Sequence, residues 1–538
     1  MGKVAAYLQQ HIWGEVSTRP QVLDALSRDG SLLHIKPDLA VYPRTTNDVR
    51  KVARFAWQLA EKGHVMPITV RGAGTDQTGG AIGKGVSLVT TRHLNRIFEL
   101  DAKQKLIRVQ PGVGLGNLKD ALLLHGLGIP SVINDEPIGT IGGAIASGAM
   151  TLGSSKSGDA LDAIDKLEVV LASGDVIQTG RISKRELNRR KGVQGFEGDI
   201  YRGIDALIED NQDTLDMIAD NELQAAGYPG IVDVKRSDGS FDLAPLFAGS
   251  QGTLGIIVEM IVKAEFVSAS RSVSVLCFTD SGLARDTIDR IENFDPASIE
   301  YYDAYFFEDA AIRGSVYDFY ERARQLGTLA SVVVVEFNDF SAKKRRNGQK
   351  KIAKMLAKSD DIALVQADGT DADDLLALRD VRRFYQLPEA NDAVVPPLLE
   401  GFYIPHDRMD DFCKSLTELE SHLKLDLPLY GWPLQDIYFT SPMLHLSKVS
   451  DRQKVFKALD ELEKLISSFA GNMVAFGGEG RMKAKFAHRN LSDAERDLYA
   501  GIKKVFDPYN MLNPGVKQPG DLRDLVDKLA HDYMPPMA

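Results

Sequence analysis

The sequence predicts an α+β protein made of two differently built regions. Up to about residue 266, short apolar runs alternate with glycine-rich turns and helical patterns. From about residue 267 to residue 500, strand-like runs alternate with long amphipathic helical patterns, which is typical of an α+β domain on an antiparallel sheet. The chain has 538 residues, enough for about two to four domains. We expect a helical lead-in (1–36), a first domain (37–266), a second domain (267–500) and a C-terminal segment (501–538).

Apolar periodicity assigns the elements of the first region. In the pattern that begins at Thr46, apolar residues recur every three or four positions, and Thr46 or Asn47 can cap the helix. The apolar run 65–70 reads as a strand because it is short and bounded by glycine. We expect helices at 20–27, 46–61 and 117–125, a strand at 106–110, and a hairpin at 167–179 with its turn at 173–175.

The second region has stronger helical signals. The pattern at 343–357 is basic and amphipathic, which predicts a helix with a solvated charged face. Ser492 and Glu495 form a capping box, so the last clear helix begins there and ends near residue 506. Further strands are expected at 273–278, 332–337, 362–366 and 401–404, and a further helix at 451–469.

The segment 71–80 (RGAGTDQTGG) is the most informative motif of the first region. It follows a predicted strand, and four of its ten residues are glycine. A glycine-rich loop can turn several backbone N–H groups toward one point, which is what a pyrophosphate needs. The segment therefore predicts a phosphate-binding loop, although a glycine-rich hairpin connection has the same composition.

A nicotinamide-type Rossmann site is not expected at this loop. The dinucleotide fingerprint G-x-G-x-x-G fails because Gln77 stands at the third glycine position. The residues that follow lead into another apolar run, whereas the Rossmann turn opens a helix.

Further glycine clusters lie in the same region. Each is explained by a turn when taken alone. Together they predict a long groove lined by backbone, suited to an extended phosphorylated ligand. The clusters are 111–116, 139–148, 154–158 and 249–257.

Composition excludes several classes of protein. The net charge of −11 argues against a nucleic-acid-binding protein. Cys277 and Cys413 are the two cysteines of the sequence, so neither a disulfide framework nor a cysteine zinc site is expected. We see no secretory signal and no apolar run long enough for an integral membrane segment. A cytoplasmic location is expected, and peripheral association with a membrane stays open.

The order of these motifs resembles the FAD-binding oxidoreductases of the vanillyl-alcohol oxidase type, which share a PCMH-type FAD-binding domain. Within them, the chain is similar to the D-lactate dehydrogenase and glycolate oxidase large-subunit branch of FAD-linked oxidases. The resemblance implies two α+β subdomains around FAD and an α+β cap domain with an antiparallel sheet. The motifs that carry it are 43–49 (PRTTNDV), 71–80, 111–113 (PGV), 140–143 (TIGG), 249–257 (GSQGTLGII) and 506–515 (FDPYNMLNPG).

The resemblance also implies which residues hold FAD. In some relatives a histidine of the phosphate loop bonds covalently to the flavin, but residues 75–78 of this chain read TDQT, so FAD is expected to be non-covalent. Asn513 is expected to reach the flavin from the C-terminal segment. The other expected cofactor-binding residues are Arg71, Gly72, Ala73, Gly74, Thr75, Asp76, Gln77, Thr78, Gly79, Thr140, Gly142, Gly143, Gly158, Gly255 and Ile257.

Oxidation of a hydroxy acid by a flavin needs a hydride acceptor, a base for the hydroxyl proton and a cation for the carboxylate. Arginine suits the last role because its planar fork makes two parallel bonds to a carboxylate. In the resembled branch this arginine lies in a helix read L-W-x-x-R-[ED], which corresponds here to residues 375–380 and to Arg379. An exposed charged helix face is the alternative explanation for Arg379.

The resembled branch often carries a metal site, and this chain departs from its motif. Tyr438 stands at the first histidine, and Gly480 stands where the catalytic histidine follows a glutamate. One histidine and one carboxylate make a poor divalent site, so no metal is expected. His445, Tyr438 and Glu479 are the alternatives for the missing base, and we retain His445 and Glu479 as catalytic candidates beside Arg379.

The sequence thus predicts an FAD-dependent oxidoreductase that oxidises a small hydroxy acid, of the D-lactate or 2-hydroxyacid kind, by hydride transfer to flavin N5. Two alternatives are an FAD enzyme for a sugar, aldonolactone or other alcohol, and a non-catalytic FAD-binding protein. The electron acceptor is not identified by the sequence.

Overall fold

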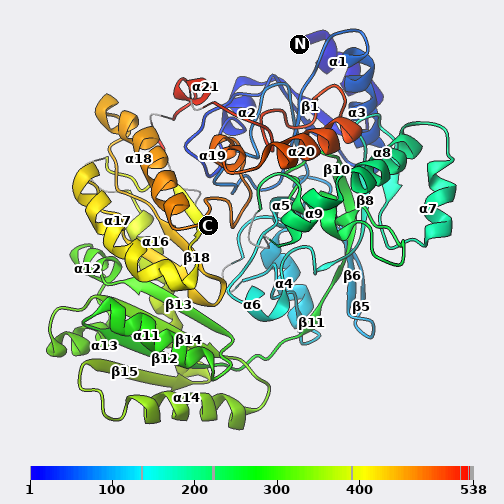
Figure 1. Cartoon of the computed structure of the whole chain (residues 1–538). Helices are drawn as coiled ribbons and strands as arrows, with labels where there is room; N and C mark the ends of the chain where they lie inside the picture. The colour runs from blue at the N-terminus through cyan, green and yellow to red at the C-terminus, as the bar shows by residue number, and fades with distance from the viewer. Residues whose placement is uncertain are drawn as a thin grey trace.

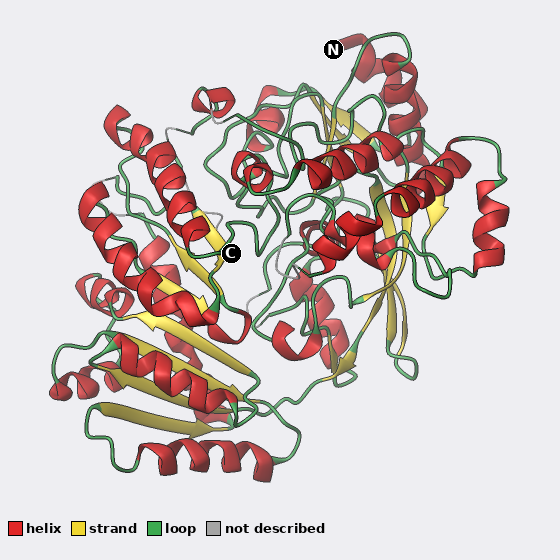
Figure 2. Cartoon of the chain, in the orientation of Figure 1, coloured by secondary structure: helices red, strands yellow, loops and turns green. Residues whose placement is uncertain are grey.

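The computed structural model describes residues 2–134, 137–220, 225–388, 392–521, 523–530 and 532–533. Over these residues the strands form three larger sheets and one two-stranded ribbon, surrounded by helices (Figure 2). This arrangement confirms the predicted α+β class. The helices before residue 260 are α1 (Gly2–His11), α2 (Pro20–Ala25), α3 (Thr46–Ala60), α4 (Leu115–Leu123), α5 (Ile141–Ser147), α6 (Ser154–Ser157), α7 (Lys184–Lys191), α8 (Phe196–Asp210), α9 (Gln212–Ala219) and α10 (Ala244–Phe247).

The first sheet is mixed and has the strand order β1-β2-β4-β3. β2, β4 and β3 are parallel, and β1 pairs with β2 in the antiparallel sense. Helix α3 forms where the apolar spacing predicts it. The predicted cap was wrong, because the side chain of Thr45, one residue earlier, accepts the Asp48 backbone N–H. The strands are β1 (Glu15–Ser17), β2 (Leu39–Tyr42), β3 (Ile68–Arg71) and β4 (Val86–Val89).

The second sheet is antiparallel, with the order β5-β6-β10-β8-β9. The β8–β9 hairpin confirms the predicted hairpin at 167–179. A short antiparallel ribbon joins β7 to β11 and leads the chain out of this half of the molecule. The strands are β5 (Ile97–Asp101), β6 (Leu106–Val109), β7 (Leu127–Gly128), β8 (Ile164–Val170), β9 (Val176–Gln178), β10 (Ile256–Lys263) and β11 (Glu265–Phe266).

The third sheet has seven strands in the order β15-β12-β14-β13-β17-β18-β16. Its paired neighbours are antiparallel, which confirms the antiparallel sheet predicted for the second region. We call this sheet and the helices packed on it the cap; it lies to the left of the other sheets in Figure 1. The strands are β12 (Ser272–Phe278), β13 (Ser298–Asp303), β14 (Ser331–Phe337), β15 (Ile362–Asp368), β16 (Leu399–Tyr403), β17 (Leu429–Trp432) and β18 (Ile437–Thr440).

Helices pack on both faces of the cap sheet, and the chain then returns to the first half of the molecule. Helix α20 begins at the predicted capping box of Ser492 and Glu495 and lies beside α8 (Figure 1). From the buried face of this helix, the Lys503 ammonium donates to the carbonyl oxygens of Thr253 and Leu512, both at 2.8 Å. The remaining helices are α11 (Ser281–Glu292), α12 (Tyr305–Ile312), α13 (Asp318–Ala323), α14 (Ala342–Leu356), α15 (Thr370–Leu376), α16 (Asp380–Gln386), α17 (Met409–Leu423), α18 (Val449–Ser468), α19 (Ala484–Arg489), α20 (Asp493–Phe506) and α21 (Arg523–Val526).

None of the described helices is long and apolar enough to cross a lipid bilayer.

Candidate active site

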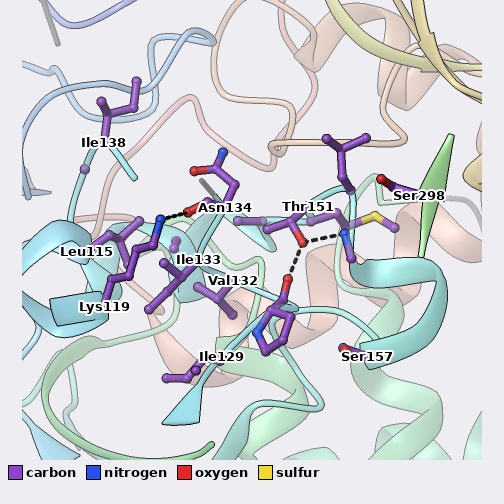
Figure 3. Close-up of a pocket in the computed structure, with 18 of the residues that line it drawn as sticks. Leu115, Lys119, Ile129, Val132, Ile133, Asn134, Ile138, Thr151, Ser157 and Ser298 are labelled. Atoms are coloured by element: carbon purple, nitrogen blue, oxygen red, sulfur yellow. Dashed lines mark hydrogen bonds between the residues drawn. The ribbon is translucent and has the colours of Figure 1, made fainter. Parts of the chain in front are cut away.

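A cavity of about 1620 Å³ lies between the first half of the chain and the cap. Small-molecule sites usually measure about 300–1,000 Å³, so this cavity has room for a large cofactor together with a substrate. Figure 3 shows part of its wall, which includes the apolar side chains of Leu115 and Val132 and the charged side chain of Lys119. Ser298 of cap strand β13 lines the same cavity.

The glycine-rich loop 71–80 forms one side of this cavity. Among the described residues, the backbone N–H groups of residues 72–77 have no acceptor, and all six of these residues line the cavity. Gly74 and Gly79 have φ values of +78° and +80°, a conformation that only glycine adopts without strain. A row of unpaired N–H groups beside a cavity is an anion-binding arrangement, which supports the predicted phosphate loop.

Asp76 closes the loop on itself. Its Oδ1 atom accepts three hydrogen bonds of 2.8 Å, from the backbone N–H groups of Thr78 and Gly80 and from the Thr78 hydroxyl. Gln251, from the loop before β10, donates to the Asp76 and Thr78 side chains from the other side. The carboxylate therefore shapes the loop, while the N–H groups before it stay available to a ligand.

Two arginines brace the loop from behind. The Arg71 guanidinium is buried and donates to the Ala81 carbonyl at 3.4 Å. Arg481 donates to the carbonyl oxygens of Gly79 and Pro514 and to the Asn513 side chain. Burial lowers the pKa of Arg481 to about 10, so it stays cationic at neutral pH. These contacts join the loop to the C-terminal segment and place positive charge behind it.

Asp29 also lies behind the loop 71–80. It accepts hydrogen bonds from Ser31 and from the Ala81 backbone N–H. Burial, and then the negative charge of Asp76, raise the pKa of Asp29 to about 7. The carboxyl is thus half protonated near neutral pH, close to where a pyrophosphate would bind.

Because the pKa of Asp29 is raised, we expect the affinity of the protein for FAD to depend on pH. A bound pyrophosphate raises the pKa of Asp29 further, so the affinity is constant below pH 6 and falls as the pH rises above 7. We expect a loss of roughly threefold to tenfold, corresponding to about 1 kcal/mol of like-charge repulsion. Titration of the apoprotein with FAD between pH 5.5 and 9 measures this, and Asp29→Asn should flatten the curve. An unchanged slope in the variant would contradict the assignment.

Most of the predicted cofactor-binding residues line the cavity. At Gly142, a Cβ atom would lie 2.8 Å from the Pro111 carbonyl oxygen, so no side chain fits there. At Gly255, a Cβ atom would lie 3.0 Å from the Phe247 ring. The predicted residues that line the cavity are Gly72, Ala73, Gly74, Thr75, Asp76, Gln77, Thr78, Thr140, Gly142, Gly143, Gly255 and Ile257.

Four of the predicted cofactor residues do not line the cavity. Arg71 and Gly79 face away from the cavity, where the Arg71 side chain bonds to the Ala81 carbonyl and the Gly79 carbonyl accepts from Arg481. Gly158 lies against Asp162. Asn513 was expected to reach the flavin, but its side-chain amide donates to the carbonyl oxygens of Gly80 and Gln251, both at 2.8 Å. Its position is that of a tie between the C-terminal segment and the loop.

The cap end of the cavity holds an ion-pair network. Alternation along β13 points Glu300 to the cavity face, where the side chain is 1% exposed. The Arg379 guanidinium contacts Glu300 Oε1 at 2.7 Å and Glu336 Oε2 at 3.1 Å. The hydroxyls of Tyr302 and Tyr430 donate to the other oxygen, Glu300 Oε2, at 2.8 and 3.0 Å. The predicted substrate arginine thus lines the cavity, but its charge is shared with two carboxylates.

Two further arginines, one turn after Arg379 in helix α16, also line the cavity. Arg382 lies over the Tyr430 ring, with its guanidinium carbon 3.9 Å from the ring centroid, and 5.3 Å from that of Phe439. Stacking of this kind fixes the guanidinium plane. Arg383 is exposed at the edge of the same cavity.

The buried pair predicts that loss of Arg379 destabilises the cap. Replacement of Arg379 by glutamine leaves Glu300 buried without its cation, which costs about 3–5 kcal/mol of unfolding free energy. Thermal and urea denaturation of the variant should show a clear decrease. Adding Glu300→Gln should restore most of it. As a matched control, Arg346→Gln removes an ion pair to Asp368 in which the arginine side chain is 63% exposed, and should cost about 0–1 kcal/mol.

His445 and Glu479 do not line the cavity. The His445 backbone N–H donates to Asp451 at the start of α18, and Leu444 pairs with Val394. Glu479 is fully buried behind Gln251, with the His488 Nε2 atom 3.5 Å from its Oε1. The catalytic roles of both residues remain predictions that their positions do not favour. Among the described residues, no three His, Cys, Asp or Glu side chains gather as a metal ion would require.

Residue patterns alone did not reveal several parts of the site. Glu300 and Glu336 lie within apolar strand patterns, where an isolated acidic residue is the signal that could have marked them as buried and paired. Asp29 precedes no recognisable motif. Gln251 stands inside the glycine cluster 249–257, and a polar residue there could have indicated a contact to the phosphate loop.

The residues present fit FAD. The loop offers unpaired N–H groups for a pyrophosphate, the glycines at 72, 142 and 255 keep side chains out of the groove, and the cavity extends from the loop to the cap.

Comparison with known proteins agrees with this fit. Residues 37–180 match the FAD binding domain, and residues 273–516 match the C-terminal domain of FAD linked oxidases. The chain is 25% identical to a glycolate oxidase subunit of Bacillus subtilis over 91% of both chains. It is 23% identical to a D-lactate dehydrogenase of Anaerostipes hadrus over 89% of both. It is 24% identical to a D-2-hydroxyglutarate dehydrogenase of Pantoea ananatis, of which it spans 50%.

A solved structure shares the fold. The 4-ethylphenol oxidase of Gulosibacter chungangensis superposes with a TM-score of 0.68 at 14% identity, over 97% of this chain and 98% of that one. At this identity the likeness shows the PCMH-type fold alone. The two domain matches and the named relatives show that this chain belongs to the FAD-linked oxidases and is an FAD-dependent oxidoreductase.

Proposed function

We propose that this flavoprotein oxidises a hydroxy acid. The observation that carries the proposal is a single cavity with an anion-binding glycine loop on one side and Arg379, Arg382 and Arg383 on the other. A bound flavin supplies the hydride acceptor. The relatives named for glycolate, D-lactate and D-2-hydroxyglutarate support an acidic alcohol as the substrate.

The substrate carboxylate binds to Arg382 in this proposal. Arg379 was the expected anchor, but Glu300 and Glu336 both contact its guanidinium. A substrate carboxylate at Arg379 would stand next to two negative charges, which costs free energy in a partly buried site. Arg382 lines the cavity on the next turn, with its guanidinium carbon over the Tyr430 ring.

Arg379 acts as a positioning residue in this arrangement. Through Glu300 it holds the hydroxyls of Tyr302 and Tyr430, and the Tyr430 ring supports Arg382. A buried network of this kind is rigid when every member is bonded, so the anchor would be held in place before substrate arrives.

The experiment is an anaerobic titration of the purified yellow protein. Hydroxy acids should reduce the flavin and so bleach its visible absorbance, and sugars and aldonolactones should not. Bleaching by sugars alone would overturn the proposal. A flavin that no substrate of either class reduces would instead favour a non-catalytic FAD-binding protein.

A further inference from the structure

We propose that the substrate is a 2-hydroxy acid with an aromatic or similarly bulky apolar side chain. This inference rests on the proposed function and deepens it. The observation behind it is an aromatic wall at the cap end of the cavity, made of Tyr430, Trp432, Phe439 and Phe476, all four of which line the cavity.

The wall is tightly packed. The Trp432 ring centroid lies 4.9 Å from that of Phe439 and 5.4 Å from that of Phe476, in edge-to-face geometry. The Phe439 and Phe476 centroids are 5.6 Å apart, and Tyr430 adjoins Phe439 at 5.4 Å. Because the rings come from β17, from β18 and from the loop after α18, the surface they form is held by three separate segments. Such a surface is preformed and needs no reordering to receive a ring.

Phe476 presents most of the apolar surface of the wall, because it is half-buried, whereas Tyr430, Trp432 and Phe439 are 4%, 8% and 4% exposed and support it. The polar atoms of the wall are already bonded within the protein. The Trp432 indole N–H donates to the Tyr430 hydroxyl at 2.7 Å, and that hydroxyl donates to Glu300 at 3.0 Å. Both phenylalanines lack polar atoms. A sugar hydroxyl would find no free partner on these four side chains, whereas a phenyl or branched alkyl group would bury apolar area against Phe476 and the exposed edges of the rings beside it.

The carboxylate anchor borders this wall. The Arg382 guanidinium lies over Tyr430 and close to Phe439. A 2-hydroxy acid whose carboxylate meets Arg382 therefore carries its side chain along the aromatic surface. Glycolate and lactate are too small to cover that surface, so they leave it wet and gain nothing from it.

Lactate and 3-phenyllactate test this directly, because they differ by one phenyl group. Both enantiomers of each should be mixed anaerobically with the holoenzyme, and the rate of flavin reduction followed at several concentrations. Burial of a phenyl ring predicts a second-order rate constant about thirtyfold to hundredfold higher for phenyllactate. Equal constants for the two acids overturn this inference and leave the proposed function standing. Failure of every hydroxy acid to reduce the flavin overturns both.

Variants separate a substrate wall from a merely structural one. Phe476 is half-buried, and Phe476→Ala should lower the phenyllactate constant by about tenfold while the lactate constant stays within about twofold. Trp432→Phe keeps most of the ring area and should retain the preference for phenyllactate. It keeps the test usable if Phe476→Ala fails to fold. Phe384→Leu alters a half-buried aromatic of α16 that does not line the cavity and serves as the matched control.

Two results of the variant experiment would overturn the proposal. An equal loss of rate for lactate and phenyllactate in Phe476→Ala would mean that the wall does not bind the side chain of the substrate. Loss of bound flavin in the same variant would mean that the wall belongs to the cofactor.

Discussion

Gly142→Ala is expected to yield a protein that purifies without flavin. Gly142 is the second residue of α5 and lines the cavity beside the phosphate loop. An alanine Cβ there would lie 2.8 Å from both the Cα atom and the carbonyl oxygen of Pro111, and neither backbone atom can rotate away. The helix must shift away from Pro111, which displaces the cavity wall, so the Kd for FAD should rise by about thirtyfold or more, or about 2 kcal/mol.

Gly116 provides the matched control. It is the second residue of α4, as Gly142 is of α5, and among the described residues an added Cβ would find no atom closer than 3.9 Å. Gly116→Ala should therefore bind FAD normally and gain slightly in helix stability. Isothermal titration of the two apoproteins with FAD decides between them. Equal affinities would show that the close approach at Gly142 has no part in holding the cofactor.

The secondary structure was largely predictable because its signals are local. The capping box at Ser492 fixes the start of α20, and the turn at 173–175 fixes the β8–β9 hairpin. The N-cap of α3 was misplaced by one residue, since Thr45 and Thr46 are chemically equivalent candidates and backbone geometry chooses between them. The boundaries predicted for the domains, at residues 36, 266 and 500, stay predictions.

In the site too, the parts formed by one continuous segment were predictable, and the parts formed by distant segments were not. The phosphate loop is a continuous segment, so its glycines could be recognised from sequence. The partners of Arg379 could not, because Glu300 and Glu336 lie on two strands that meet it through the tertiary fold. Asp29 reaches the end of the loop by accepting the backbone N–H of Ala81, which lies 52 residues further along the chain. Glu479 is likewise buried in contact with Gln251 and His488, and the sequence pattern does not show that these residues meet.

Arg382→Gln is expected to lower the efficiency of hydroxy acid oxidation by about a hundredfold, or about 2.7 kcal/mol, mainly through a higher KM. Glutamine keeps a polar side chain but loses the charge and the fork that bind a carboxylate. The flavin content should not change, because the phosphate loop lies on the opposite side of the cavity. Anaerobic reduction of the flavin by a single hydroxy acid at increasing concentration separates binding from the rate of reduction.

The neighbouring arginines make this result interpretable. Arg383→Gln removes the same charge from an exposed position on the same helix, where solvent screens it, and should cost no more than about threefold. The double variant Arg379→Gln with Glu300→Gln removes the expected anchor together with its buried partner, so the cap should stay folded. Because the carboxylate is assigned to Arg382, that double variant should keep measurable affinity for the acid. If it loses all affinity while Arg382→Gln retains it, the carboxylate binds at Arg379, and the two glutamates must give way to admit it.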